Sequence, residues 1–144
     1  MNIISICIIA FIVLETANIG AMYFFPGSKF ANAVGIFNAW EKSKKDPEIH
    51  NFVKYLVNWV AGTKLIFIIL LLVILFTADG QTLIWTAGAL VISIASFYWR
   101  LFPLIRKMDQ DGEITPRGYS KVLGWMILAF ILLFLFSLMY GILL

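Results

Sequence analysis

The sequence predicts an all-α polytopic membrane protein: a bundle of four transmembrane helices with a short amphipathic surface helix in the first cytoplasmic loop. Of the 144 residues, 62% are apolar and only 13% are charged, whereas an average soluble domain has about 25% charged residues. The mean hydropathy is +0.94. So few charged residues cannot supply the polar surface that a water-soluble globule needs. The composition therefore excludes a soluble enzyme, a nucleic-acid-binding domain and a disordered tail. The expected surroundings are a lipid bilayer.

Four apolar stretches are long enough to cross the bilayer, because about 20 helical residues span roughly 30 Å of hydrocarbon. Backbone groups in lipid must bond within their own segment, so these stretches are expected to be helices. No basic residue precedes the first stretch and no small-residue cleavage site follows it, which predicts a retained span rather than a removed signal peptide. A single membrane domain is expected over residues 1–144, with spans at about 3–25, 52–77, 82–105 and 119–144.

The ends of the spans carry helix signals. Asp46-Pro47-Glu48 combines an N-cap, a proline for the first turn and an acidic residue. Thr115-Pro116 repeats this pattern before the fourth span. Only the short turn at Asp79-Gly80 separates the second and third spans, which predicts an antiparallel hairpin. Pro103 is expected to kink or loosen the third span near its inner end.

Two further segments are interpreted from their apolar pattern. Between Lys29 and Trp40, apolar residues recur at helical spacing (Phe30, Val34, Phe37, Trp40), as in an amphipathic helix on the membrane surface. The alternative is a helix packed on the ends of the bundle. The fourth span is almost wholly apolar, which favours a peripheral, lipid-facing helix or an oligomer contact.

The basic residues predict the topology. All of them except Lys64 lie in or beside the loops 26–51 and 106–118, whereas the Asp79–Gln81 turn and both chain ends carry none. Loops rich in Lys and Arg remain in the cytoplasm. The sequence therefore predicts a multi-pass protein of the cell membrane with both termini outside and both long loops cytoplasmic.

Two ionisable residues lie within spans, where each costs at least ~2.5–3.5 kcal/mol near the helix centre. Glu15 lies in the inner half of the first span. Lys64 in the second span lies about 10 Å below the inner boundary at 1.5 Å per residue, which is close to the depth of Glu15. We expect the two to face each other as an ion pair. Alternatively, Lys64 extends along its helix toward the cytoplasmic water.

Other polar residues are expected to join this pair. Asn18 follows Glu15 on the same helix face, and Asn58 lies in the second span. The third span carries a stripe of small and polar residues, expected to face other helices (Thr82, Thr86, Ala89, Ser93, Ser96, Arg100). The predicted intramembrane binding layer consists of Glu15, Asn18, Asn58, Lys64, Ser96 and Arg100. No catalytic residue can be assigned.

Metal and cofactor sites are not expected. Cys7 is the only cysteine and His50 the only histidine, so the chain has no disulfide and no multi-histidine metal set. The four-span layout with a long first loop resembles the membrane-associated eicosanoid and glutathione enzymes. Of the second-helix pattern of the glutathione enzymes, only Asn58 stands in a comparable place.

Three functional hypotheses follow. The first is a non-enzymatic unit, either transporter-like and then expected to be homo-oligomeric, or an accessory subunit of a membrane assembly. In transport, Lys64 or Arg100 would attract an anionic group and Glu15 would carry a proton or act as counter-ion. The alternative is a membrane-embedded enzyme acting on a lipid or hydrophobic substrate, with Glu15 as acid or base and Arg100 binding phosphate or carboxylate. The third is a scaffold whose polar layer only fixes helix register.

Overall fold

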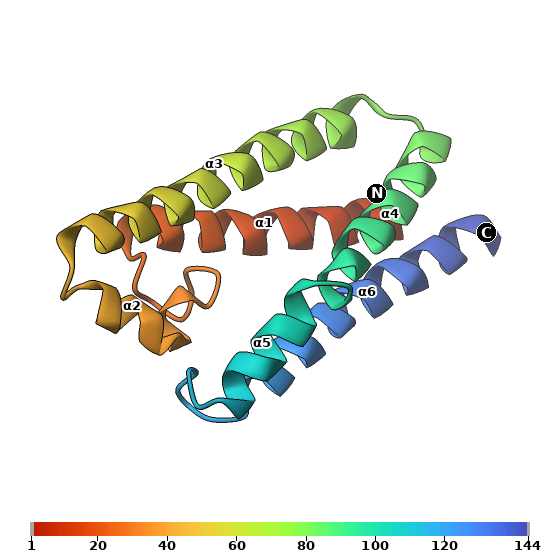
Figure 1. Cartoon of the computed structure of the whole chain (residues 1–144). Coiled ribbons are helices and arrows are strands. Elements are labelled where there is room, and N and C mark those ends of the chain that lie inside the picture. The colour runs from red at the N-terminus through yellow and green to blue at the C-terminus, as the bar shows by residue number, and fades with distance from the viewer. Residues whose placement is uncertain (1, 144) are drawn as a thin grey trace.

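The computed structural model describes residues 2–143 and is all-helical in its regular elements, with four long apolar segments of a length that fits a membrane crossing (Figure 1). The first, second and fourth segments are single helices. The third consists of two helices joined by a 3₁₀ turn. These four segments overlap the apolar stretches 3–25, 52–77, 82–105 and 119–144 of the sequence. The elements are α1 (Ile3–Phe24), η1 (Val34–Ile36), α2 (Asn38–Ser43), α3 (Pro47–Thr77), α4 (Gly80–Ala95), η2 (Ser96–Tyr98), α5 (Leu101–Gln110) and α6 (Tyr119–Leu143).

Helix α1 occupies the centre of the bundle and packs against α3, α4 and α6. Its buried residues recur at helical spacing from Ile4 to Met22. The ring of Phe11 lies edge-on to Phe67 of α3 and to Phe130 and Phe134 of α6, with centroid distances of 6.4, 5.6 and 5.6 Å. This aromatic contact joins three of the four spans in the core.

The predicted hairpin of the second and third spans is open rather than packed. Helices α3 and α4 are joined by a short turn, but they diverge from it, and α3 packs on α1 and α2 instead of along α4 (Figure 1). A short connection fixes the direction of two helices, but it does not ensure that they touch along their length.

The fourth span, expected to be peripheral, has one packed face, while large apolar side chains on its other face stay exposed. Helix α6 packs against α1, α4 and α5, and Phe134 and Ser137 on it are fully buried. Small residues create the contact surface: a side chain at Gly124 would meet the ring of Phe102 at 2.8 Å, and one at Gly141 would meet Ile4 at 2.7 Å. In a helix that is apolar on every side, these small residues are the signal for the packed face.

The third span is interrupted near its predicted kink. Helix α4 ends at Ala95, a 3₁₀ turn follows, and α5 begins at Leu101. Pro103 therefore lies in the first turn of a new helix, where its missing N–H is not needed. The hydroxyl of Tyr98 donates to the carbonyl oxygen of Gly124, which holds this break against α6.

The first long loop contains a short helix, as predicted, but at α2 rather than over Lys29–Trp40. The segment before α2 folds onto the end of the bundle, which supports the alternative expectation. Ala33 and Ile36 are buried in a second apolar cluster with Ile105 and Ile114. Backbone bonds join the two long loops: Asn38 N–H donates to Glu113 O at 2.9 Å and Thr115 N–H donates to Ile36 O at 2.8 Å.

Three aspartates cap helix starts. Asp46 caps α3 by accepting from Glu48 N–H, as its sequence signal predicts. Helix α6 begins at Tyr119, after the predicted Thr115-Pro116 start, because buried Asp109 accepts from the N–H groups of Gly118 and Ser120 instead. Asp79 caps α4 by accepting from the Thr82 N–H at 2.8 Å.

The Asp79 cap predicts a local pH response. Hydrogen bonds from the Thr82 side chain and backbone N–H hold the pKa of Asp79 below its ordinary value. A depressed folded-state pKa means that the cap contributes fully above the ordinary carboxyl pKa and is lost as pH falls through the lowered value. We expect the protection factors of the first amides of α4, which correct for the intrinsic pH dependence of exchange, to fall at the acidic end of a pH series. Hydrogen-exchange mass spectrometry measures this, and Asp79→Asn removes the pH-dependent part. An unchanged acid response in that variant would contradict the assignment.

Candidate intramembrane polar site

An ion pair joins α1 to α3 within the membrane-spanning part of the bundle. The Lys64 ammonium nitrogen lies 2.7 Å from Glu15 Oε2, and the two side chains retain 26% and 21% of their exposure. The predicted pairing of these two residues is confirmed. Both side chains are therefore mostly shielded by protein, although neither is fully enclosed.

Two asparagines complete the surroundings of Lys64. Its ammonium group donates to Asn18 Oδ1 at 2.8 Å and to Asn32 Oδ1 at 3.2 Å. With Glu15, each of its three hydrogens has an acceptor. The amide group of Asn18 donates in turn to the carbonyl oxygen of Phe30 at 2.7 Å. We call Glu15, Asn18, Asn32 and Lys64 the polar cluster.

The chain positions these groups from three elements. Glu15 and Asn18 are one helical turn apart on α1, so both face α3. The Lys64 side chain leans toward the N-terminus of α3, as helical side chains do, and so reaches the loop after α1. Asn32 lies in that loop with a left-handed backbone at φ 51°, a conformation that asparagine adopts more readily than most residues. Lys64 therefore forms the expected ion pair with Glu15 and also extends toward the loop after α1, so the two alternatives predicted for it occur together.

The structure does not bring the other predicted residues into this cluster. Asn58 is exposed on α3, and Ser96 and Arg100 lie exposed on the third span. The small and polar stripe does not face the helices of this chain, because α4 buries Leu83, Ala87 and Leu90 instead. Its hydroxyl groups bond to their own helix: Thr86 donates to Thr82 O and Ser96 to Ser93 O. Local bonding of this kind satisfies a hydroxyl without a neighbouring helix.

Two features of this site were not predicted from the sequence: Asn32 as a member of the polar cluster, and the Phe30 carbonyl oxygen that accepts from Asn18. The predicted surface helix over Lys29–Trp40 is defined by its apolar residues alone, and it predicts no contact between Asn32 and the spans. The available signal was the pair Pro26-Gly27 followed by Ser28, which ends α1 and starts a tight turn. Ser28 O accepts from the N–H groups of Ala31 and Gly35 at 3.1 and 3.2 Å, so the chain folds back over the end of α1.

The polar cluster offers one acid, one cation and two amides. A carboxylate bound to an ammonium group can hold helices in register, and it can also exchange a proton if the pair separates. Within residues 2–143, no three His, Cys, Asp or Glu side chains gather closely enough to hold a metal ion.

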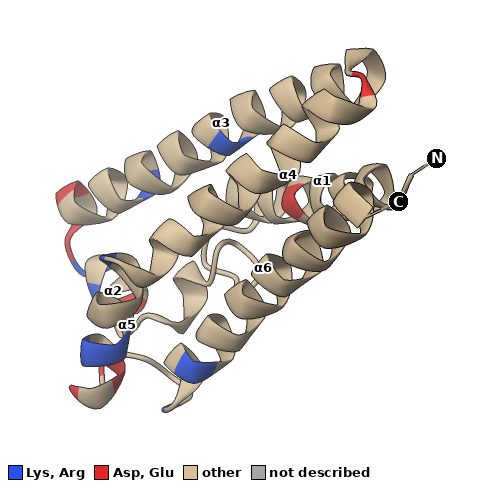
Figure 2. Cartoon of the chain, turned by 90° about the vertical axis from the view of Figure 1, so that its right-hand side faces the viewer, with Lys and Arg blue, Asp and Glu red and all other residues tan. Residues whose placement is uncertain are grey.

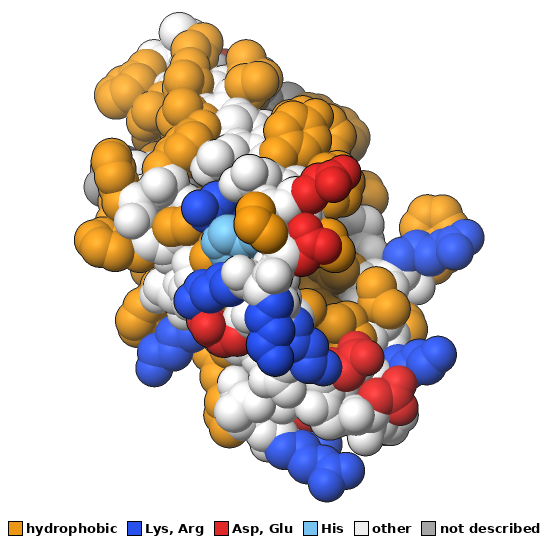
Figure 3. Space-filling model, turned by 60° about the vertical axis from the view of Figure 1, so that its left-hand side comes forward, with side chains coloured by type: hydrophobic (Ala, Val, Ile, Leu, Met, Phe, Trp, Pro, Cys, Tyr) orange, Lys and Arg blue, Asp and Glu red, His pale blue; other side chains and the backbone are white. Residues whose placement is uncertain are grey.

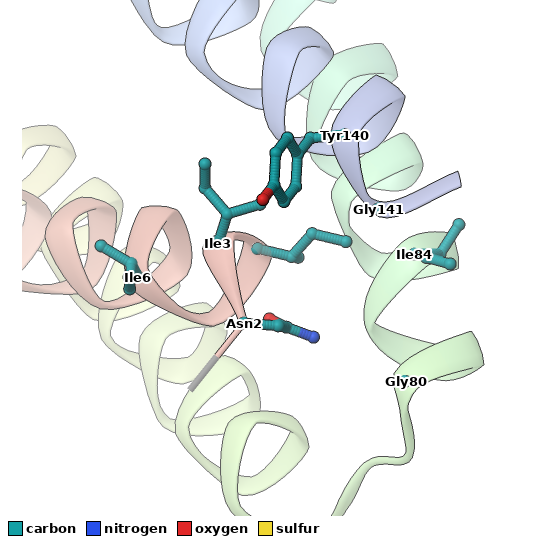
Figure 4. A pocket seen from close by; sticks show the side chains of 8 residues that line it. Asn2, Ile3, Ile6, Gly80, Ile84, Tyr140 and Gly141 are labelled. Carbon is teal, nitrogen blue, oxygen red and sulfur yellow. The ribbon is translucent and has the colours of Figure 1, made fainter. Parts of the chain in front are cut away.

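A surface hollow lies at the opposite end of the bundle from the charged loops. This pocket has a volume of about 530 Å³ and lies between the start of α1, the start of α4 and the end of α6 (Figure 4). Its walls are mainly apolar, and Tyr140 and Asn2 supply the polar side chains. It is separate from the polar cluster.

Comparisons with protein-family models, with curated proteins and with solved structures find no match for this chain.

Proposed function

We propose that this four-span membrane protein is a non-enzymatic accessory subunit of a membrane assembly, with its two charged loops on the cytoplasmic side. One observation supports the proposal above the others. All three hydrogens of the Lys64 ammonium group have acceptors within the chain, so its bonding capacity serves the fold of the protein rather than a substrate. The topology is supported by the basic residues, of which all except Lys64 lie in or beside the loops 26–51 and 106–118. Figure 2 shows basic residues gathered toward that end of the molecule.

The open arrangement of α3 is consistent with a subunit role. Beyond its contacts with α1 and α2, this helix leaves large apolar side chains uncovered over its whole length, from Phe52 to Phe76. An accessory subunit needs such an uncovered surface, and the polar cluster holds α3 at its angle.

A double substitution separates this role from transport and from catalysis. We expect Glu15→Met alone to reduce the amount of native assembly extracted in mild detergent, and Glu15→Met/Lys64→Met to restore it, because two apolar side chains can replace a structural ion pair. Native mass spectrometry measures the assembly. If the charges themselves carried a proton or bound a substrate, the double variant would be the more defective one.

Proteoliposomes provide the complementary measurement. We expect the purified chain to pass no more protons than empty liposomes under a pH gradient. A proton flux that Glu15→Gln abolishes would overturn the accessory role in favour of transport. Extraction of the chain as a monomer from its native membrane would overturn it as well.

A further inference from the structure

We propose that a ring of cations at one end of the bundle binds the headgroups of anionic phospholipids. The ring consists of one basic residue at the corresponding end of each span: Lys29, Lys54, Arg100 and Lys121. This inference concerns a surface distinct from the polar cluster and does not depend on the accessory role.

The positions of these cations along their helices place them at headgroup depth. Each distance is taken along the helix to the end opposite the charged loops, at 1.5 Å per residue. It is about 35 Å for Lys54 on α3, about 30 Å for Arg100 after α4, and about 33 Å for Lys121 on α6. The hydrocarbon layer is about 30 Å thick. Lys29 follows α1 by a short turn. If the opposite helix ends lie at one membrane boundary, the ring reaches the phosphate level at the other.

An exposed aromatic side chain accompanies each cation within one helical turn. Phe30, Tyr55, Trp99 and Trp125 keep 69%, 59%, 77% and 71% of their exposure. The Lys29 ammonium group lies 5.1 Å from the ring centre of Phe30, and the Arg100 guanidinium lies 5.7 Å from that of Trp99. Tryptophan and tyrosine favour the interface between hydrocarbon and headgroups, so Tyr55, Trp99 and Trp125 support the same depth.

The charges at this end are arranged to attract an anion. Ten cations against six carboxylates leave a formal charge of +4 there, whereas the turn at the opposite end carries only Asp79. Several of the carboxylates are occupied: Asp109 and Asp46 accept from backbone N–H groups, and Glu41 binds Lys44. Within residues 2–143 the only ion pairs are Lys44–Glu41 and Lys64–Glu15. The ring cations therefore have no carboxylate partner, and basic side chains project outward from this end (Figure 3).

These observations favour a lipid headgroup over an acidic protein segment as the partner. Each of the four spans, or the turn that follows it, contributes one of these cations, and their positions along the helices match the expected depth of lipid phosphates. Anionic lipid surfaces attract each nearby Lys or Arg by about 1 kcal/mol, which is about a fivefold preference.

Tryptophan quenching tests the proposal, because Trp99 and Trp125 lie beside ring cations. The full chain is reconstituted in two sets of phosphatidylcholine vesicles with about one-tenth phosphatidylglycerol, and only one of the two lipids is brominated in each set. We expect at least about threefold more quenching by the brominated phosphatidylglycerol than its share of the lipid predicts. We also expect this excess to shrink in about 0.5 M salt as the charges are screened.

Matched variants locate the effect. Lys29→Gln/Lys54→Gln/Arg100→Gln/Lys121→Gln should lose the excess quenching. Lys44→Gln/Arg106→Gln/Lys107→Gln/Arg117→Gln removes the same charge but spares the ring, and should keep it. Equal loss in both variants would show a diffuse charge effect, and quenching in proportion to lipid share in the unmodified chain would overturn the proposal. That last measurement needs no variant, so it stands even if the ring variant fails to fold.

Discussion

Lys64→Met is expected to destabilise the protein by about 2–4 kcal/mol, the cost of leaving one member of a shielded ion pair without its partner. In the chain as described, the ammonium group of Lys64 is the only cation paired with Glu15. Removing it leaves the carboxylate inside the bundle, and the short glutamate side chain cannot reach the loop at the basic end.

Glu15→Met should cost less, about 1–2 kcal/mol, because Lys64 retains Asn18 and Asn32 as acceptors and already extends toward the loop. Hydrogen bonds in membrane proteins contribute about 0.6 kcal/mol on average, so the two amides compensate only part of the lost charge pair. The double variant should lie within about 1 kcal/mol of the unmodified chain.

Unfolding in mixed micelles of SDS and dodecylmaltoside, followed by circular dichroism, gives the four free energies of this double-mutant cycle. The expected signature is a coupling between the two sites of about 2 kcal/mol or more. Costs that simply add would show that Glu15 and Lys64 act independently, and the polar cluster would then have no structural role.

The sequence was informative about the spans and the ion pair for physical reasons that do not require a known fold. Span lengths follow from the thickness of hydrocarbon, and a charge in lipid has few favourable partners. Glu15 and Lys64 could therefore be paired from depth alone. Helix starts such as Asp46-Pro47 were readable because the cap and the proline act locally.

The arrangement of the helices was less predictable because apolar side chains suit lipid and protein contacts equally well. In α6 only the small residues Gly124 and Gly141 mark the packed face, and the apolar side chains themselves do not single out Phe134 as a core residue. The stripe on α4 was expected to face other helices, but backbone carbonyls of its own helix satisfy the hydroxyls of Thr86 and Ser96. Asn32 was missed because its role depends on a turn that brings distant residues together.

That turn supplies the second large effect. Gly35→Ala should destabilise the protein by about 2–4 kcal/mol, as expected where a substitution forces a backbone clash. A side-chain carbon at Gly35 would lie 2.0 Å from the carbonyl oxygen of Gly27 and 2.8 Å from the carbonyl carbon of Ser28. Because these are backbone atoms, the loop itself must move, and the bond from Gly35 N–H to Ser28 O would break.

Movement of this loop would also break the hydrogen bond between Asn32 and Lys64. The loss of that bond distinguishes the expected effect of Gly35→Ala from a purely local clash. Asn32→Ala alone should cost about 0.6 kcal/mol, but it should add nothing in the background of Gly35→Ala. Gly88→Ala is the matched control: it lies within α4 with open space around it and should be neutral or stabilising by up to about 1 kcal/mol. The same micelle unfolding measures Gly35→Ala, Asn32→Ala, their combination and Gly88→Ala. If the costs of Gly35→Ala and Asn32→Ala simply added, Asn32 would still bind Lys64 despite the clash, which would contradict the prediction.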